Sequence, residues 1–110
     1  MDKEQVVKKV KDAISLIKDN TNLDYLVLFG SYAKGTNHKW SDIDLAIVSN
    51  NLPKGILNDK TRNILRGLYD IDCMFEPHFF RTERWETPEH GSFVEYIKKY
   101  GEIIYSNGSK

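Results

Sequence analysis

The spacing of apolar residues changes along this chain, and each spacing predicts a type of element. A spacing of three or four residues predicts a helix, and a short apolar run predicts a strand. From about residue 3 to residue 19, apolar residues stand three or four positions apart, which predicts an amphipathic helix with lysines on its outer face. The near-continuous apolar run Tyr25–Phe29 predicts a buried strand that ends at Gly30, and Ile43–Val48 predicts a second strand. The polar segment between these strands, residues 30–41, predicts a turn with a short helical piece.

The middle of the chain predicts one more helix and one more strand. The helix is expected from Leu57 to Leu68, with Asn58 or Asp59 as its cap. The apolar run Ile71–Phe75 predicts a third strand, which Glu76-Pro77 would end.

The last third of the chain has a weaker pattern. Residues 78–86 are aromatic and charged without clear periodicity, so we expect an irregular segment there. Thr87-Pro88-Glu89 has the signature of a helix start, and this helix would continue until Gly101 stops it. Ile103–Tyr105 predicts a last short strand. The sequence shows no repeats, linkers or low-complexity tracts, and we expect a single domain over residues 1–110.

Composition narrows the class of protein. With 40% hydrophobic residues, a mean hydropathy of -0.53 and no apolar run near the ~20 residues that span a bilayer, the chain is not expected in a membrane. Its N-terminal segment is charged throughout, which argues against a signal peptide and for the cytoplasm. Sixteen basic residues balance sixteen acidic ones, so nucleic acid is not an expected partner. The single cysteine, Cys73, excludes an internal disulfide and a cysteine-based zinc site, and we expect it to be buried.

Carboxylates gather on the predicted strands. Asp42 and Asp44 stand two positions apart, so their side chains share one face of the second strand. Like charges about 4 Å apart repel by about 4 kcal/mol at an effective dielectric of 20, which favours raised pKa values or bound cations. Asp72 would join the pair if the third strand lies beside the second, and Asp70 shares its face. Three carboxylates suit Mg²⁺ or Mn²⁺, and two such ions roughly 3.5–4 Å apart can orient a triphosphate.

Gly30-Ser31 supplies a candidate contact for that triphosphate. A glycine at a strand end lets the backbone approach phosphate closely, and the serine hydroxyl adds a donor. Lys34 could reach the outer phosphates, although a solvent-exposed lysine fits the position equally well. The competing interpretation of the whole pattern is a surface turn followed by a strand with two capping aspartates.

The stretch LVLFGSYAKGTNHKWSDIDLAIV resembles the signature of the DNA polymerase beta-like nucleotidyltransferase superfamily, in which Gly-Ser, ten residues and Asp-x-Asp follow a strand. The small size, IDCMFE and the ending FVEYIKKYGEIIYS resemble its minimal nucleotidyltransferase (MNT) group. The resemblance implies an α/β fold with a small mixed sheet flanked by helices. It also implies roles for particular residues. These are metal ligation by Asp42, Asp44 and Asp72, with Asp72 preferred over Asp70, and triphosphate contact by Gly30 and Ser31. Lys34 replaces a usual arginine-like residue, keeping the charge but losing bidentate phosphate binding.

The resemblance further implies a reaction and a partner. MNT proteins of this size are typically antitoxins of HEPN-domain toxins, some of which they modify by transferring AMP from ATP to a tyrosine. We therefore expect a metal-dependent nucleotidyltransferase that uses two Mg²⁺ ions, or Mn²⁺, with ATP as donor and a HEPN-type toxin as partner. Two alternatives stay open: an antitoxin that neutralises its toxin by binding alone, and nucleotidyl transfer to a small molecule or an RNA end.

Other residues receive structural interpretations. His38, His78 and His90 lack the spacing of metal ligands and are expected in loops or on the surface. Trp40 is expected to pack beneath the turn before the acidic strand, with stacking on a base as the alternative. The aromatic residues of segment 78–86 fit either packing or a partner surface.

Overall fold

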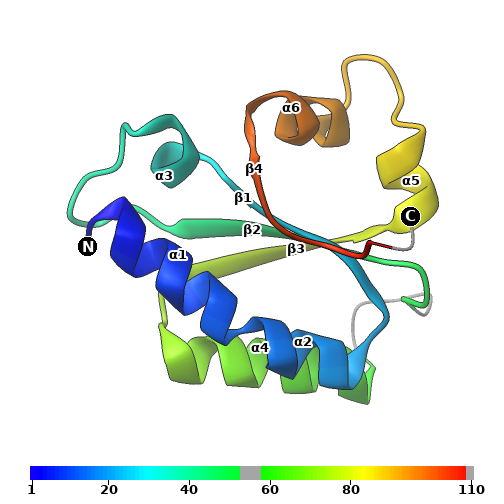
Figure 1. Ribbon diagram of the computed structural model, residues 1–110, viewed down its shortest axis with the longest axis horizontal. Helices are drawn as coiled ribbons and strands as arrows, with labels where there is room; N and C mark the ends of the chain where they lie inside the picture. The colour runs from blue at the N-terminus through cyan, green and yellow to red at the C-terminus, as the bar shows by residue number, and fades with distance from the viewer. Residues whose placement is uncertain (53–57, 109–110) are drawn as a thin grey trace.

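The computed structural model describes residues 1–52 and 58–108, and it folds them around a mixed β-sheet with helices on both faces (Figure 1). The strands are β1 (Leu23–Phe29), β2 (Ile43–Ser49), β3 (Phe75–Arg81) and β4 (Glu102–Ser106). They lie in the order β3-β2-β1-β4; β1 is antiparallel to β2 and to β4, whereas β2 and β3 are parallel. The expected α/β fold with a small mixed sheet flanked by helices is confirmed.

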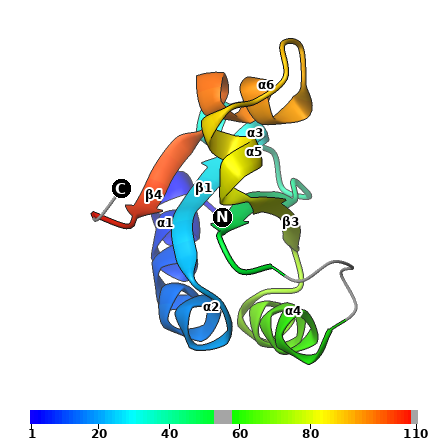
Figure 2. The same ribbon diagram turned by 90° about the vertical axis from the view of Figure 1, so that its right-hand side faces the viewer.

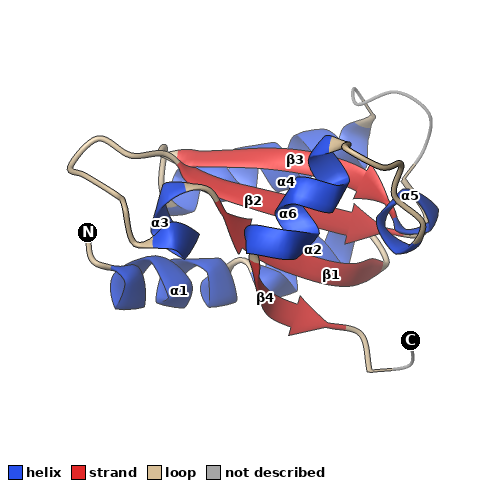
Figure 3. Cartoon of the chain, turned by 90° about the horizontal axis from the view of Figure 1, so that it is seen from above, coloured by secondary structure: helices blue, strands red, loops and turns tan. Residues whose placement is uncertain are grey.

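Helices lie above and below the sheet (Figure 2). One face is covered by α1 (Lys3–Asp12), α2 (Ile14–Asn20) and α4 (Asp59–Ile71). The other face is covered by α5 (Thr82–Glu86) and α6 (Phe93–Tyr100), and α3 (Ser31–Lys34) stands at the end of the sheet where β1 ends. Seen from above, α6 passes over β1 and β2 (Figure 3). Each face therefore has its own apolar cluster, one under α1, α2 and α4 and one under α5 and α6.

The predicted N-terminal helix forms as two helices instead of one. Asp2 caps α1 in a capping box with Gln5, and α1 and α2 meet at Ala13, which keeps right-handed helical angles and donates its amide to Lys9 O. The apolar stripe is buried as its spacing predicts, with Val6 and Ile17 fully inaccessible to solvent. The amphipathic pattern was thus correct over both helices, although it did not reveal their boundary at Ala13.

The predicted third strand is wrong in its position. Ile71 is the last residue of α4, and β3 begins only at Phe75 and continues to Arg81. Ile71 stays helical because it extends the apolar face of α4 and packs beside the buried Leu68 against the core. Pro77 does not end the strand, because β3 is an edge strand and proline is tolerated there. Asn58 caps α4 as expected, whereas Leu57 lies outside the described residues.

The C-terminal third is more regular than the sequence indicated. The segment 78–86, expected to be irregular, contains the rest of β3 and α5. The following helix begins at Phe93, with Ser92 as its cap, and not at residues 87–89. The last predicted strand lies within β4. Within residues 1–52 and 58–108, no helix has the length and apolar character needed to cross a bilayer.

Candidate active site

The glycine-serine turn and the acidic strand meet at one end of the sheet. Because β1 and β2 are antiparallel, the last residue of β1 pairs with the first residues of β2, and Phe29 lies opposite Asp44. Gly30 follows directly with a φ of 77°, in the left-handed region that side chains disfavour. A Cβ atom at Gly30 would also overlap the Asp44 carboxylate. The turn therefore requires glycine for its backbone conformation and for its contact with Asp44.

Asp42 and Asp44 share one face of the sheet, as the sequence predicts. Asp42 is exposed just before β2, and Asp44 is half-buried within it. Ala46 and Val48, further along the same face, pack in the apolar cluster under α5 and α6. By the alternation along β2, the carboxylates consequently share the face of the sheet that carries α6. Figure 1 shows α3 at this end of the sheet.

Asp72, the predicted third carboxylate, lies elsewhere. It is the C-cap of α4, on the side of the sheet covered by α1 and α4, and not a strand residue. Its Oδ2 accepts a hydrogen bond of 2.6 Å from Lys9 Nζ, and its Oδ1 accepts one of 2.8 Å from the Met74 amide. Burial raises the pKa of Asp72, but the hydrogen bonds from Lys9 and Met74 and the charge of Lys9 outweigh it, so that its pKa is lowered. The structure thus makes Asp72 a partner of Lys9.

Asp70, the alternative to Asp72, is not placed beside the acidic pair either. It lies in the last turn of α4 and is exposed. Neither aspartate lies beside Asp44, for one reason: the run from Ile71 to Phe75 was assigned to a strand, whereas its first residue completes a helix.

Glu76 occupies the place that the sequence assigned to Asp72. The parallel pairing of β2 and β3 sets Glu76 directly opposite Asp44, so the two side chains share a face. The pKa of Asp44 is raised from 3.8 to about 6 by its burial, by the charges of Glu76 and Asp42, and by a hydrogen bond with Glu76. The sequence did contain a signal for this residue, because Glu76 and His78 repeat the two-residue spacing of Asp42 and Asp44.

His78 is the second residue that sequence reasoning missed. It lies in β3 and is half-buried, not in a loop or on the open surface. Within the described part of the chain, ligand atoms of Asp44, Glu76 and His78 all lie within 4.8 Å of one another. This is the cluster of metal-ligating side chains that the fold brings together at the end of β1.

The neighbouring basic and aromatic residues differ from expectation in part. Ser31 begins α3 next to the cluster. Lys34 lies against α6, with its Nζ 5.0 Å from the ring centre of Tyr96 and 5.5 Å from that of Tyr100. Trp40 does not pack beneath the turn, because its side chain is 72% exposed. Cys73 is exposed as well, contrary to prediction.

The donor set of the cluster fits a divalent cation. Asp44 and Glu76 offer hard oxygen ligands in one place, which is what Mg²⁺ and Mn²⁺ require, and the charge of Asp42 acts on Asp44 as well. Half-buried Asp44 faces two other carboxylates, and its raised pKa shows that the negative charge is unfavourable there without a compensating proton or cation. A bound cation would remove that penalty, so the residues present match the metal that the sequence pattern implies.

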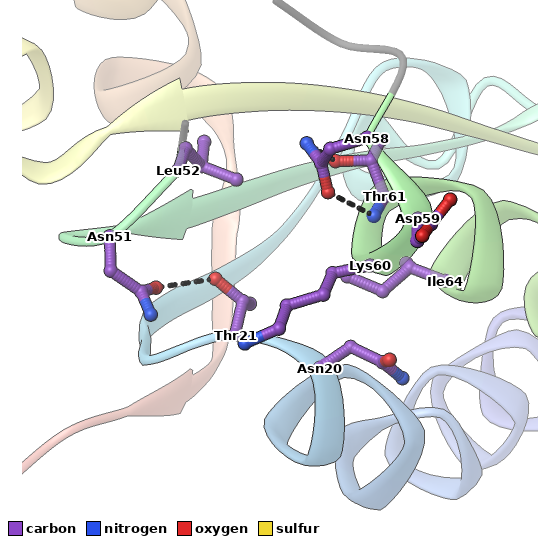
Figure 4. Close-up of a pocket in the computed structure, with 9 residues that line it drawn as sticks. All are labelled: Asn20, Thr21, Asn51, Leu52, Asn58, Asp59, Lys60, Thr61 and Ile64. Atoms are coloured by element: carbon purple, nitrogen blue, oxygen red, sulfur yellow. Dashed lines mark hydrogen bonds between the residues drawn. The ribbon is translucent and has the colours of Figure 1, made fainter. Parts of the chain in front are cut away.

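A separate hollow of about 350 Å³ lies at the opposite end of the sheet, between α2, the end of β2 and α4 (Figure 4). Its polar groups bond to one another: Thr21 Oγ1 donates to Asn51 Oδ1 at 2.7 Å, and Asn58 Oδ1 accepts from the backbone amide of Thr61 at 2.9 Å. None of Asp44, Glu76 and His78 lines this hollow. The chemistry is therefore expected at the α3 end.

A strand, a Gly-Ser turn and clustered carboxylates on neighbouring strands define a nucleotidyltransferase, and comparison with known proteins agrees. The family described as "Polymerase beta, Nucleotidyltransferase" matches residues 11–110. The chain belongs to this family, and the predicted enzyme class is confirmed.

Relatives of this chain carry the name of protein adenylyltransferase. MJ0141 of Methanocaldococcus jannaschii, which bears that name provisionally, is 31% identical over 101 residues, or 88% of this chain and 93% of its own length. MntA of Shewanella oneidensis is 49% identical over 37 residues, which cover 33% of this chain and only 27% of MntA. The shorter match includes too little of MntA to transfer the activity of the whole protein.

Solved structures show the same fold. A toxin–antitoxin structure with AMP-PNP matches with a TM-score of 0.57 at 24% identity, covering 90% of this chain and 74% of the other. A complex of a tri-AMPylated Shewanella oneidensis HEPN toxin with its MNT antitoxin matches with a TM-score of 0.54 at 18% identity, covering 92% and 72%. At these identities the likeness concerns the fold.

Proposed function

We propose that this protein transfers AMP from ATP to a tyrosine hydroxyl of a HEPN-type toxin and thereby acts as its antitoxin. The observation that carries the proposal is the fit of Gly30 against Asp44, which joins the phosphate-binding turn to the carboxylates of β2 and β3. The relative named MntA and the toxin–antitoxin complexes of the same fold support the acceptor and the partner.

Each residue of the site has a proposed task. Asp42, Asp44 and Glu76 would hold two Mg²⁺ ions, or Mn²⁺, with Glu76 in the role expected of Asp72. When bound, the ions neutralise the charge that develops on the triphosphate and the leaving pyrophosphate. The backbone at Gly30 and the Ser31 hydroxyl contact the triphosphate. Lys34, at the end of α3, stands three residues after Ser31. Its side chain would contact the outer phosphates after it leaves the ring of Tyr96 in α6.

The reaction is an in-line displacement at the α-phosphorus. The tyrosine oxygen of the acceptor forms a new P–O bond, the bond to pyrophosphate breaks, and the tyrosine proton passes to the Glu76 carboxylate. Glu76 suits this task because its side chain is 50% exposed, and an acceptor can reach it from solvent. The protein itself thus orients the donor and receives the proton, while the partner supplies the nucleophile.

Transfer of label from ATP tests the proposal. The protein is incubated with ATP labelled in the α-phosphate, Mg²⁺ and a HEPN-domain protein from a neighbouring gene of its genome, and the modified residue is identified by mass spectrometry. The wild-type protein should label a tyrosine of the partner, and Asp42→Asn with Asp44→Asn should abolish labelling. Asp70→Asn is the matched control, since Asp70 is an exposed aspartate outside the cluster, and it should label normally.

If the toxin is neutralised by binding alone, the variant without the two aspartates should still protect cells. If the Asp42→Asn, Asp44→Asn protein still protects cells from the toxin while labelling is lost, binding is sufficient and the catalytic proposal for the antitoxin effect is wrong. Labelling of an aminoglycoside or of tRNA, but not of the HEPN protein, would shift the acceptor to the small-molecule or RNA class.

A further inference from the structure

A nitrogen donor stands among the carboxylates of the acidic cluster. His78 lies two residues after Glu76 on the same face of β3, opposite Ala46, the residue two positions beyond Asp44. One ligand atom each from Asp44, Glu76 and His78 falls within 4.8 Å of the others. Ligands about 2.1 Å from one ion lie about 3 to 4.2 Å apart in octahedral geometry. From the 4.8 Å limit, a pair at neighbouring positions would have to close by about 1.8 Å and a pair at opposite positions by about 0.6 Å, which are changes within the reach of side-chain rotation.

The imidazole is held in place by aromatic neighbours. Its ring centre lies 5.3 Å from that of Phe29 and 5.6 Å from that of Phe93, both in tilted or edge-on contacts. Only 30% of the side chain is exposed, and Nε2 is directed to the Glu76 side, 3.7 Å from Oε1. This separation exceeds a normal hydrogen bond and leaves Nε2 without a short contact to Glu76. A ring packed in this way is already oriented to donate its lone pair into the cluster.

We propose that His78 is a nitrogen ligand of the divalent ion at this site and makes the site prefer transition-metal ions over Mg²⁺. Imidazole nitrogen is a softer donor than carboxylate oxygen, and its affinity for divalent ions rises from Mn²⁺ through Co²⁺, whereas Mg²⁺ selects oxygen. The inference rests on the proposed function, because it concerns the same metal site, and it adds the identity of the ion.

Pulsed electron paramagnetic resonance of the wild-type protein with MnCl₂, in the absence of nucleotide, is the direct test. A ¹⁴N coupling from a directly bound imidazole is expected, and it should disappear in His78→Gln. Mn²⁺ affinity should fall by about 10-fold or more in that variant, whereas Mg²⁺ affinity, measured by competition, should change by less than about 3-fold. His90→Gln is the matched control, because His90 is fully exposed beside a glutamate, and it should keep both the coupling and the affinity.

Several outcomes would overturn the assignment. Absence of ¹⁴N coupling in the wild type excludes His78 as a ligand even if the Gln variant fails to fold. Equal losses of Mn²⁺ and Mg²⁺ affinity in folded His78→Gln would show that the residue does not select the metal. If Mn²⁺ binds without ¹⁴N coupling while AMP transfer proceeds, only this inference fails. If no divalent ion binds and no transfer occurs, the proposed function fails with it.

Discussion

Replacing Asp44 by asparagine should stabilise the metal-free protein at neutral pH while abolishing its activity. Asp44 is half-buried beside Glu76 and near Asp42, and its pKa in the folded protein is raised from 3.8 to about 6. The folded protein therefore keeps a proton on Asp44 at pH values where the unfolded chain has released it. Stability from this group is fully present below pH 4 and is lost as the pH rises through about 6.

The size of the effect follows from the same pKa. A rise from 3.8 to about 6 corresponds to roughly 3 kcal/mol for a fully buried group, and solvent screening at the half-exposed Asp44 reduces this to about 1 kcal/mol. Asp44→Asn removes the ionisable group but keeps its shape. The variant should thus be more stable than the wild type by about 1 kcal/mol at pH 7.5 and nearly equal to it at pH 4.

Urea unfolding in EDTA at the two pH values measures this difference. Asp70→Asn, an exposed aspartate at the end of α4, is the control and should show little change at either pH. An Asp44→Asn protein that is less stable than the wild type at pH 7.5 would refute the reasoning, as would a difference that does not depend on pH. Addition of Mn²⁺ should reverse the order, because the cation stabilises only the protein that retains the carboxylate.

Further predictions concern the turn and the third carboxylate. Gly30→Ala should cost more stability than Gly35→Ala, measured by thermal unfolding, because Gly30 combines φ 77° and ψ -149° with a contact to Asp44, whereas Gly35 has φ 76° and ψ 18° and nothing within 4 Å of an added Cβ; equal losses would contradict this. Backbone strain alone should cost about 1 kcal/mol or more at either glycine. Glu76→Gln should abolish AMP transfer, whereas Asp72→Asn should lower stability without abolishing transfer, and the reverse pattern in the labelling assay would restore Asp72 to the site. Because the pKa of Asp72 is lowered, its stabilising effect should be lost as the pH falls below the ordinary range of an aspartate, which acid unfolding of Asp72→Asn against wild type would show.

The parts of the site that were predictable are local in the chain. Asp42 and Asp44 share a face because strand side chains alternate, and this follows from two residues of spacing whatever the rest of the fold does. Gly30 was identified by its place after a buried strand, although the reason was incomplete: the structure adds its positive φ and its contact with Asp44. The apolar stripes of the N-terminal helices were equally predictable, since burial follows periodicity.

The third carboxylate was beyond such reasoning. Whether the run from Ile71 to Phe75 is strand or helix end depends on packing, because its apolar residues suit either. The helix continues to Ile71, which delays the strand until Phe75 and places Glu76, not Asp72, opposite Asp44. A shift in where the strand begins changes every pairing partner along it.

The sequence by itself determined the nucleotidyltransferase class and two parts of the candidate site. These are the turn at Gly30 and the paired carboxylates at the start of β2. Only the tertiary structure decided which side chains complete the cluster, because the parallel register of β2 and β3 brings Glu76 opposite Asp44 and His78 close to both. That register joins segments about thirty residues apart, and it depends on the end of α4 and on the packing of both sheet faces. Periodicity within one segment carries no information about the partner across the sheet.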